Sequence, residues 1–268
     1  MSIEASKISS AGAKKYEKPS IVRTAAGIGA GLVPLHFTLG AINNNAGRAC
    51  LTKMKDIGLG LTADEFNAVK KASGGLLEVS GLKKFGTEII TAASENLEKI
   101  KEFVSKDTEK GFTHKLPKFL KDRIKNIQIS SAANGVNAFY LMKENKIIIP
   151  ESKSMSLSVF HEAGHAMNKN IGLLGKTLQK CRGVGLLALP IALIGIFKSK
   201  KAEGEKPQGA VDKTLTFIKN HSGKLASLCM LPMLAEEGLA SLKGNKLPAN
   251  LRTPELPAKV SKFKKFGF

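Results

Sequence analysis

The chain has 268 residues, which is enough for one catalytic domain with a sizeable hydrophobic core and short accessory segments. An apolar fraction of 43% and a mean hydropathy of -0.06 exclude a membrane protein built mainly from spanning helices. The 42 lysines and arginines against 22 acidic residues give a net charge of +20, so the protein is either merely basic or matched to an anionic partner such as lipid or nucleic acid.

The cysteines and the N-terminus indicate a reducing compartment. Cys50, Cys181 and Cys229 lie far apart and form no CxxC pair, which favours reduced thiols over a disulfide framework. No secretory signal is recognisable, because the first apolar stretch begins only near Thr24. We therefore expect the catalytic part to face the cytoplasm.

The N-terminal part predicts a basic leader followed by a helical region. Residues 1–20 are rich in Ser, Lys and Ala without an apolar period, and we expect them to be disordered. Residues 21–110 are expected to form a helical N-terminal region. Its apolar segment, residues 24–42, is long enough to span a bilayer, and a buried or interfacial helix is the alternative.

Within this region, two helices are expected. Thr62 and Glu65 have the spacing of a capping box and predict the start of the first helix, which we expect to end at the pair Gly74-Gly75. Apolar residues then recur at helical spacing with charged residues between them. This pattern predicts the second helix over residues 87–104.

Residues 111–243 are expected to form the catalytic domain, with strands before its central helix. Residues 124–131 alternate apolar and polar side chains, and residues 136–142 and 146–149 are aromatic or β-branched on either side of a turn. Ser154 or Ser156 is then expected to cap a helix that runs to about Asn168.

Two apolar runs follow that helix. Residues 183–197 are apolar throughout, too short for a comfortable membrane span, and flanked by basic residues. They are compatible with a re-entrant or surface-dipping hairpin in a membrane, and the alternative is a buried core helix. Residues 225–235 form the second run. The tail, residues 244–268, mixes Lys with Phe and predicts either a solvated tail or a membrane contact.

The chemistry centres on His161-Glu162-Ala163-Gly164-His165. Helical residues four apart lie on one face, so His161 and His165 can present two imidazoles to one zinc ion. Glu162 can reach a water on that zinc and act as its general base, since zinc lowers the pKa of the water to about 7. The alternative is two surface histidines at helical spacing.

A catalytic zinc needs a third protein ligand, and the pair Glu236-Glu237 after the second apolar run is the best candidate. Carboxylates beside an apolar segment are costly to bury unless they bind a metal or hydrogen-bond donors. The residues alone leave open which of the two binds zinc and which orients a ligand.

The chain resembles the gluzincin clan of metallopeptidases, and within it the membrane family of heat-shock zinc proteases and prenyl-protein (CaaX-type) endopeptidases. Three stretches carry the resemblance: Asn137-Ala138-Phe139, Lys146–Pro150 and Phe160–Ala166. The family's Glu-x-x-Ala-Asp motif aligns with Glu237-Gly238-Leu239-Ala240-Ser241, in which Ser241 replaces the Asp.

The resemblance implies a mainly helical α+β, zincin-like domain with a small sheet before the HExxH helix and apolar helices in or on a membrane. It makes Glu237 the third zinc ligand and Glu236 a residue that orients a ligand. It also places Asn137 and Ala138 on an edge strand that holds the substrate backbone.

These features together predict a zinc metalloendopeptidase at the cytoplasmic face of a membrane, with a peptide or protein substrate. Anionic lipid is the expected partner, whereas few aromatic residues and no recognisable motif weigh against nucleic acid. The alternative is a basic membrane- or nucleic-acid-binding protein whose zinc site is degenerate and not catalytic.

Overall fold

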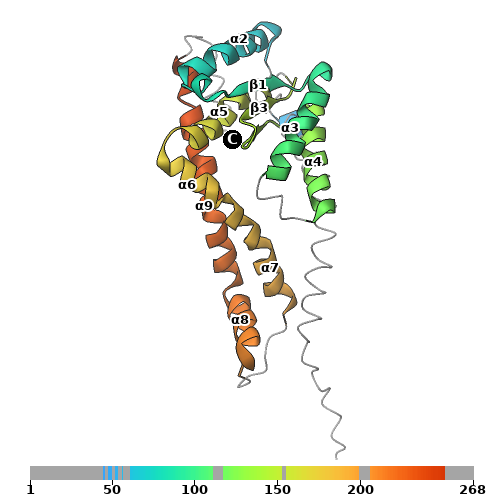
Figure 1. The fold of residues 1–268 in the computed structure, drawn as a ribbon, viewed down its shortest axis with the longest axis vertical. Coiled ribbons are helices and arrows are strands. Elements are labelled where there is room, and N and C mark those ends of the chain that lie inside the picture. Colours follow the sequence, from blue (N-terminus) through green and yellow to red (C-terminus); the bar gives the residue numbers. More distant parts are fainter. Residues whose placement is uncertain are drawn as a thin grey trace, which may run out of the picture.

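The computed structural model describes residues 61–110, 117–152, 155–198 and 206–250, together with a few isolated residues between 45 and 56. The predicted leader (1–20), the apolar segment (24–42) and most of the predicted tail (244–268) lie outside the described residues. The described part is α+β, mostly helical with one small three-stranded sheet, as the sequence predicted (Figure 1).

The sheet has the strand order β1-β3-β2, with bounds Glu88–Thr91 for β1, Phe139–Leu141 for β2 and Lys146–Ile149 for β3. The predicted hairpin is confirmed, because β2 and β3 pair antiparallel and Asn145 turns the chain between them with a φ of 55°. β1 pairs with β3 in parallel, so β2 forms one edge of the sheet.

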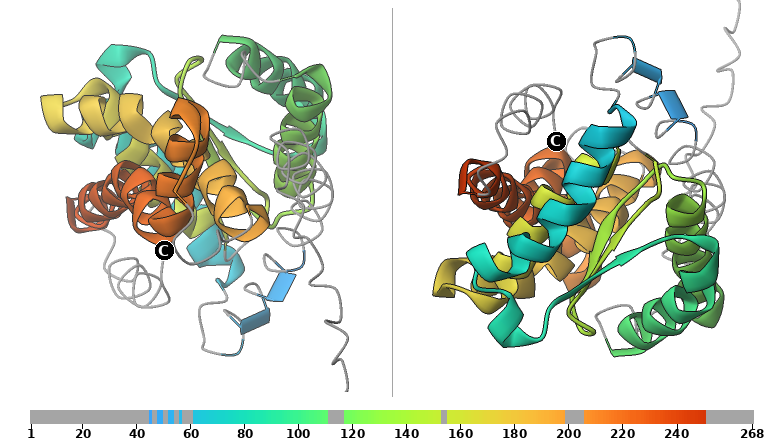
Figure 2. Two further views of the ribbon diagram at one scale, coloured as in Figure 1. Left: turned by 90° about the horizontal axis from the view of Figure 1, so that it is seen from below. Right: turned by 90° about the horizontal axis from the view of Figure 1, so that it is seen from above.

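Each face of the sheet packs against helices. Successive strand residues point to opposite faces, so Ile148 packs toward α3 (Leu97–Lys110) and α4 (Lys118–Ala133), while Ile147 and Ile149 pack toward α2 (Ala63–Val79) and α5 (Val159–Asn170). Figure 2 shows α2 crossing one side of the strands and α3 with α4 covering the other. This packing holds α5 firmly against the sheet.

The predicted capping box is confirmed at the start of α2. The Glu65 amide donates to the Thr62 hydroxyl, and the Thr62 amide donates to the Glu65 carboxylate. The expected end at Gly74-Gly75 is wrong, since α2 continues to Val79. Leu76 is fully buried beyond the glycines, and its packing outweighs a cost of about 1 kcal/mol per helical glycine.

Two other element predictions are wrong. The expected helix over 87–104 is β1 followed by α3, because its first isoleucines pair with β3 and only the later apolar residues form a helical face. The expected strand over 124–131 lies within α4. Its apolar residues are compatible with helical spacing, and α4 packs against α3 as a helical pair.

Helix α5 carries the HExxH residues. Ser154 lies outside the described residues. The predicted cap at Ser156 is wrong, because a 3-10 turn (η4, Met155–Ser158) leads directly into α5 and Ser158 occupies the N-cap position, without a side-chain capping hydrogen bond to the helix. The predicted helix itself is confirmed and ends at Asn170.

Most of the remaining helices form a long extension away from the sheet: α6 (Leu173–Cys181), η5 (Arg182–Leu187), α7 (Ala188–Phe197), α8 (Gly209–Asn220) and the first part of α9 (Ser222–Gly244). The C-terminal end of α9 packs against α5, and the short α10 (Leu247–Asn250) packs against α2, with Leu247 in the core. Figure 1 shows α7 beside α8 and α9, with the far end of this extension distant from the strands. The predicted insertion 183–197 is therefore helical and continuous with α6.

Two segments of this extension are long and apolar enough to cross a membrane, Leu173–Phe197 and Ser222–Gly244. Only 6% and 11% of their most apolar windows are buried within the chain, so most of each window is exposed, whereas the C-terminal end of α9 packs against α5. The exposed apolar side chains include Leu187, Ile196, Phe217, Leu228 and Leu231.

Candidate metal centre

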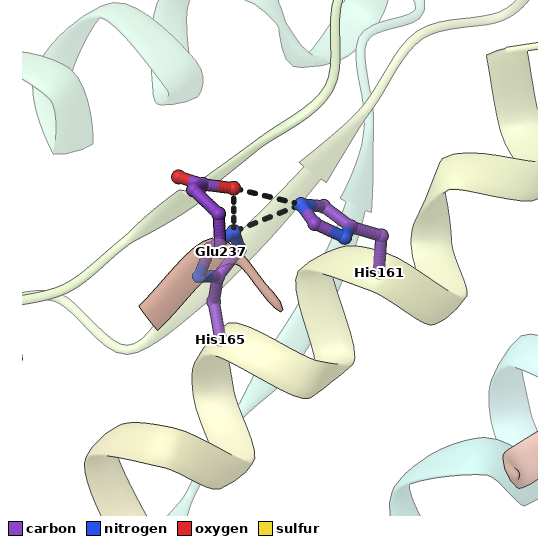
Figure 3. Close-up of side chains that lie close together, drawn as sticks. All are labelled: His161, His165 and Glu237. Carbon is purple, nitrogen blue, oxygen red and sulfur yellow. Dashed lines mark hydrogen bonds and ion pairs between the residues drawn. The ribbon is translucent and has the colours of Figure 1, made fainter. Parts of the chain in front are cut away.

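Helix α5 presents two imidazoles side by side. His161 and His165 lie one turn apart, and their Nε2 atoms are 3.0 Å from each other with the ring planes at 88° (Figure 3). His165 is buried, and His161 lies at the edge of a cleft. The spacing in the sequence produces this arrangement directly, because four residues make slightly more than one helical turn.

Helix α9 brings Glu237 to the same point. Its Oε2 lies 3.2 Å from Nε2 of His161 and 3.3 Å from Nε2 of His165. The two helices can approach this closely because glycines lie at their crossing: a Cβ on Gly164 would lie 1.9 Å from the Ala240 carbonyl oxygen. The close crossing therefore sets the position of Glu237 relative to the imidazoles.

These three residues could hold a metal ion. In a tetrahedral zinc site with bonds of 2.0–2.2 Å, neighbouring ligand atoms are about 3.3–3.6 Å apart. The three observed separations of 3.0, 3.2 and 3.3 Å are close to that value. Two imidazole nitrogens and a carboxylate oxygen that converge so closely repel one another unless a cation or a proton lies between them.

Glu236 organises the far side of His165. It is fully buried, and its Oε1 accepts from His165 Nδ1 at 2.9 Å, from Asn168 Nδ2 at 2.9 Å and from Gln179 Nε2 at 3.0 Å. Its Oε2 accepts from Arg182 Nη1 at 2.6 Å. Because a carboxylate only accepts, the neutral form of His165 carries its proton on Nδ1 and turns its Nε2 lone pair toward the cluster.

Ser241 is a hydrogen-bonding partner of His161, as Glu236 is of His165. Its Oγ lies 3.0 Å from His161 Nδ1, one helical turn beyond Glu237 on α9. Ser241 therefore provides His161 with a hydrogen-bonding partner. The serine hydroxyl can both donate and accept, so it orients the ring without adding a negative charge.

The surroundings shift the pKa values of several site residues in the metal-free protein, among them His165 and Glu162. Burial alone lowers the pKa of His165, but its hydrogen bonds to Glu236 and Glu237 outweigh this and raise it to about 10. Burial raises the pKa of Glu162, and the neighbouring imidazoles only partly offset the effect. Glu162 is 7% exposed and lies in the wall of the cleft.

A cleft of about 300 Å³ opens beside the cluster. Asn137 and Ala138 line it immediately before β2, together with Phe139 and Tyr140 of that edge strand. The predicted substrate-binding residues thus lie at the same cleft as His161 and Glu162, and the main chain of an edge strand offers groups that can pair with an extended peptide.

No protein-family model, curated protein or solved structure matches the chain. Within the structure, every residue predicted for the site lies at or beside the cluster, with Glu236 behind it and Asn137 at the cleft. Sequence reasoning missed Asn168, Gln179 and Arg182. Asn168 follows His165 by one helical turn, and that spacing is the signal that could have identified it.

Proposed function

We propose that this protein is a zinc-dependent metalloendopeptidase that hydrolyses peptide bonds at a membrane surface. The observation that carries the proposal is the convergence of His161, His165 and Glu237 within 3.0–3.3 Å, beside the buried carboxylate of Glu162. Two imidazoles and one carboxylate form a donor set typical of catalytic zinc, which keeps a fourth position for water or substrate.

The donor set also favours zinc over magnesium and calcium. Mg²⁺ and Ca²⁺ prefer oxygen ligands, whereas imidazole suits zinc, copper, iron and nickel. Zinc bound there would lower the pKa of a water molecule and stabilise negative charge on the oxygen of the attacked carbonyl.

Glu162 is proposed to move the protons. As a base it would take one proton from water while the water oxygen bonds to the carbonyl carbon, and it would then give that proton to the leaving amine as the peptide C–N bond breaks. Its raised pKa suits both steps, because an ordinary solvated glutamate is a weaker base near neutral pH.

The proposed substrate is an extended peptide paired with the edge of the sheet. Asn137 and Ala138 would offer main-chain groups to it, and the neighbouring β2 residues line the same cleft. This arrangement supports the resemblance to the gluzincin membrane family, which we propose as the chain's relationship.

The membrane part of the proposal depends on the exposed apolar helices. The apolar side chains of α7, α8 and α9 would cost free energy in water, at roughly 25 cal/mol for each Å² exposed, and a bilayer would cover them. The net charge of +20 favours the anionic cytoplasmic leaflet as the surface that holds the enzyme.

The test is proteolysis by the full chain in lipid nanodiscs with an unstructured protein substrate, comparing wild type with Glu162→Gln. The amide keeps the size of the side chain but cannot take the proton, so we expect zinc content to stay unchanged and cleavage to fall at least about 100-fold. Full activity in Glu162→Gln, or no cleavage by zinc-loaded wild type across unrelated unfolded substrates, would overturn the proposal.

A further inference from the structure

Arg182 connects the two carboxylates of α9. It is the first residue of η5, where the apolar segment begins, and its guanidinium reaches back to both residues of the Glu236-Glu237 pair. Nη1 lies 2.6 Å from Oε2 of Glu236, and Nη2 lies 2.8 Å from Oε1 of Glu237. Arginine suits this task because its planar fork fixes two acceptors at once.

The two oxygens of Glu237 therefore have different partners. Oε1 accepts from Arg182, whereas Oε2 faces the Nε2 atoms of His161 and His165 at 3.2 and 3.3 Å. A carboxylate whose second oxygen is held by a guanidinium at 2.8 Å cannot readily turn both oxygens toward a metal.

The burial of Glu236 strengthens the constraint. This carboxylate is fully buried and holds the other arm of the same guanidinium, and its other hydrogen bonds all lie on Oε1, so moving Arg182 away would take the guanidinium from the buried Oε2. Arg182 itself is about one third exposed, and its two ion pairs fix it from one side of the site.

We propose that Arg182 is a positioning residue that keeps Glu237 a one-oxygen ligand, so that the fourth position of the metal stays open for water next to Glu162. The inference rests on the proposed metal site. Without Arg182, Glu237 is free to bind through both oxygens, which would raise the coordination number and compete with the water.

The experiment uses cobalt as the probe, in the full chain in nanodiscs. Four-coordinate Co²⁺ absorbs visible light far more strongly than five- or six-coordinate Co²⁺, so the spectrum reports the coordination number independently of activity. The variants are Arg182→Gln and Arg182→Lys, with Lys180→Gln as the matched control. Lys180 lies two residues earlier and is exposed, so its loss removes the same charge away from the carboxylates.

We expect Arg182→Gln to bind one Co²⁺ with clearly weaker visible absorption and to lose about 10- to 100-fold in kcat/KM with zinc. Lys180→Gln should match wild type in both. Arg182→Lys should weaken the absorption in the same direction, since one ammonium is a point charge without the fork, and it serves if the glutamine variant does not fold.

An Arg182→Gln spectrum identical to wild type would overturn the inference, and so would complete loss of cobalt binding by a folded variant. Absence of cobalt binding by wild type would instead overturn the proposed metal site. The two failures are therefore distinguishable from one set of spectra.

Discussion

The close crossing of α5 and α9 makes Gly164→Ala the sharpest structural perturbation of the site. The added Cβ would lie 1.9 Å from the Ala240 carbonyl oxygen and 2.9 Å from the Ala240 Cα. Both are main-chain atoms and cannot rotate aside, so the helices must move apart by at least about 1 Å before the closest contact reaches even 3.0 Å.

That movement would separate the ligands that the two helices carry. Metal sites tolerate deviations of about 0.2 Å, and a displacement of about 1 Å exceeds this several-fold. We therefore expect the zinc affinity of Gly164→Ala to fall at least about 100-fold, and overpacking to lower the free energy of unfolding by about 1–3 kcal/mol.

The assay is competition for zinc with a chromophoric chelator, alongside thermal unfolding of the metal-free protein. Gly238→Ala is the matched control, because Gly238 lies next to Glu237 on the same helix and has no atom within 4 Å of the position of a Cβ. We expect that control to bind zinc as tightly as wild type. Wild-type zinc affinity in Gly164→Ala would refute the claim that this crossing sets the site.

Three further outcomes follow from the site and the extension. His165 has a pKa of about 10 in the metal-free protein, so zinc must displace a proton from it below that pH. Zinc affinity should therefore fall about tenfold for each unit by which the pH is lowered from 8 to 6, and a zinc affinity that does not change over this range would contradict the account. In the same chelator competition, Ser241→Ala should bind zinc about tenfold more weakly than wild type, whereas Ser241→Asp should not. Equal zinc affinities of Ser241→Ala and wild type would show that Ser241 does not orient His161. The side chains of Leu187 and Leu231 are 53% and 54% exposed. The double variant Leu187→Lys, Leu231→Lys should increase the fraction of protein that alkaline carbonate extracts from membranes. Unchanged extraction would show that these positions do not contact lipid.

The features predicted correctly from the sequence are local ones. The HExxH spacing, the capping box at Thr62 and the β2–β3 hairpin each depend on residues within a few positions of one another, where backbone geometry alone decides the outcome. The convergence of Glu237 with the histidines required more than spacing, and it came from the resemblance.

The features that were missed depend on distant partners. β1 is a short strand whose pairing with β3 lies far along the chain, so its isoleucines alone resemble the start of a helix. Arg182 stands before an apolar run and in the sequence is one of the basic residues that flank it, because its carboxylate partners lie 54 and 55 residues later. Only the folded chain shows that it belongs to the site.

The measurement that tests the central claim most directly is the metal content of the full chain, purified without chelators and analysed by native and elemental mass spectrometry. Wild type should carry one zinc per chain, and Glu237→Ala should lose it or hold it far more weakly while remaining folded. Wild type without zinc after incubation with excess Zn²⁺, or Glu237→Ala with unchanged zinc, would contradict the claim that His161, His165 and Glu237 form the metal site.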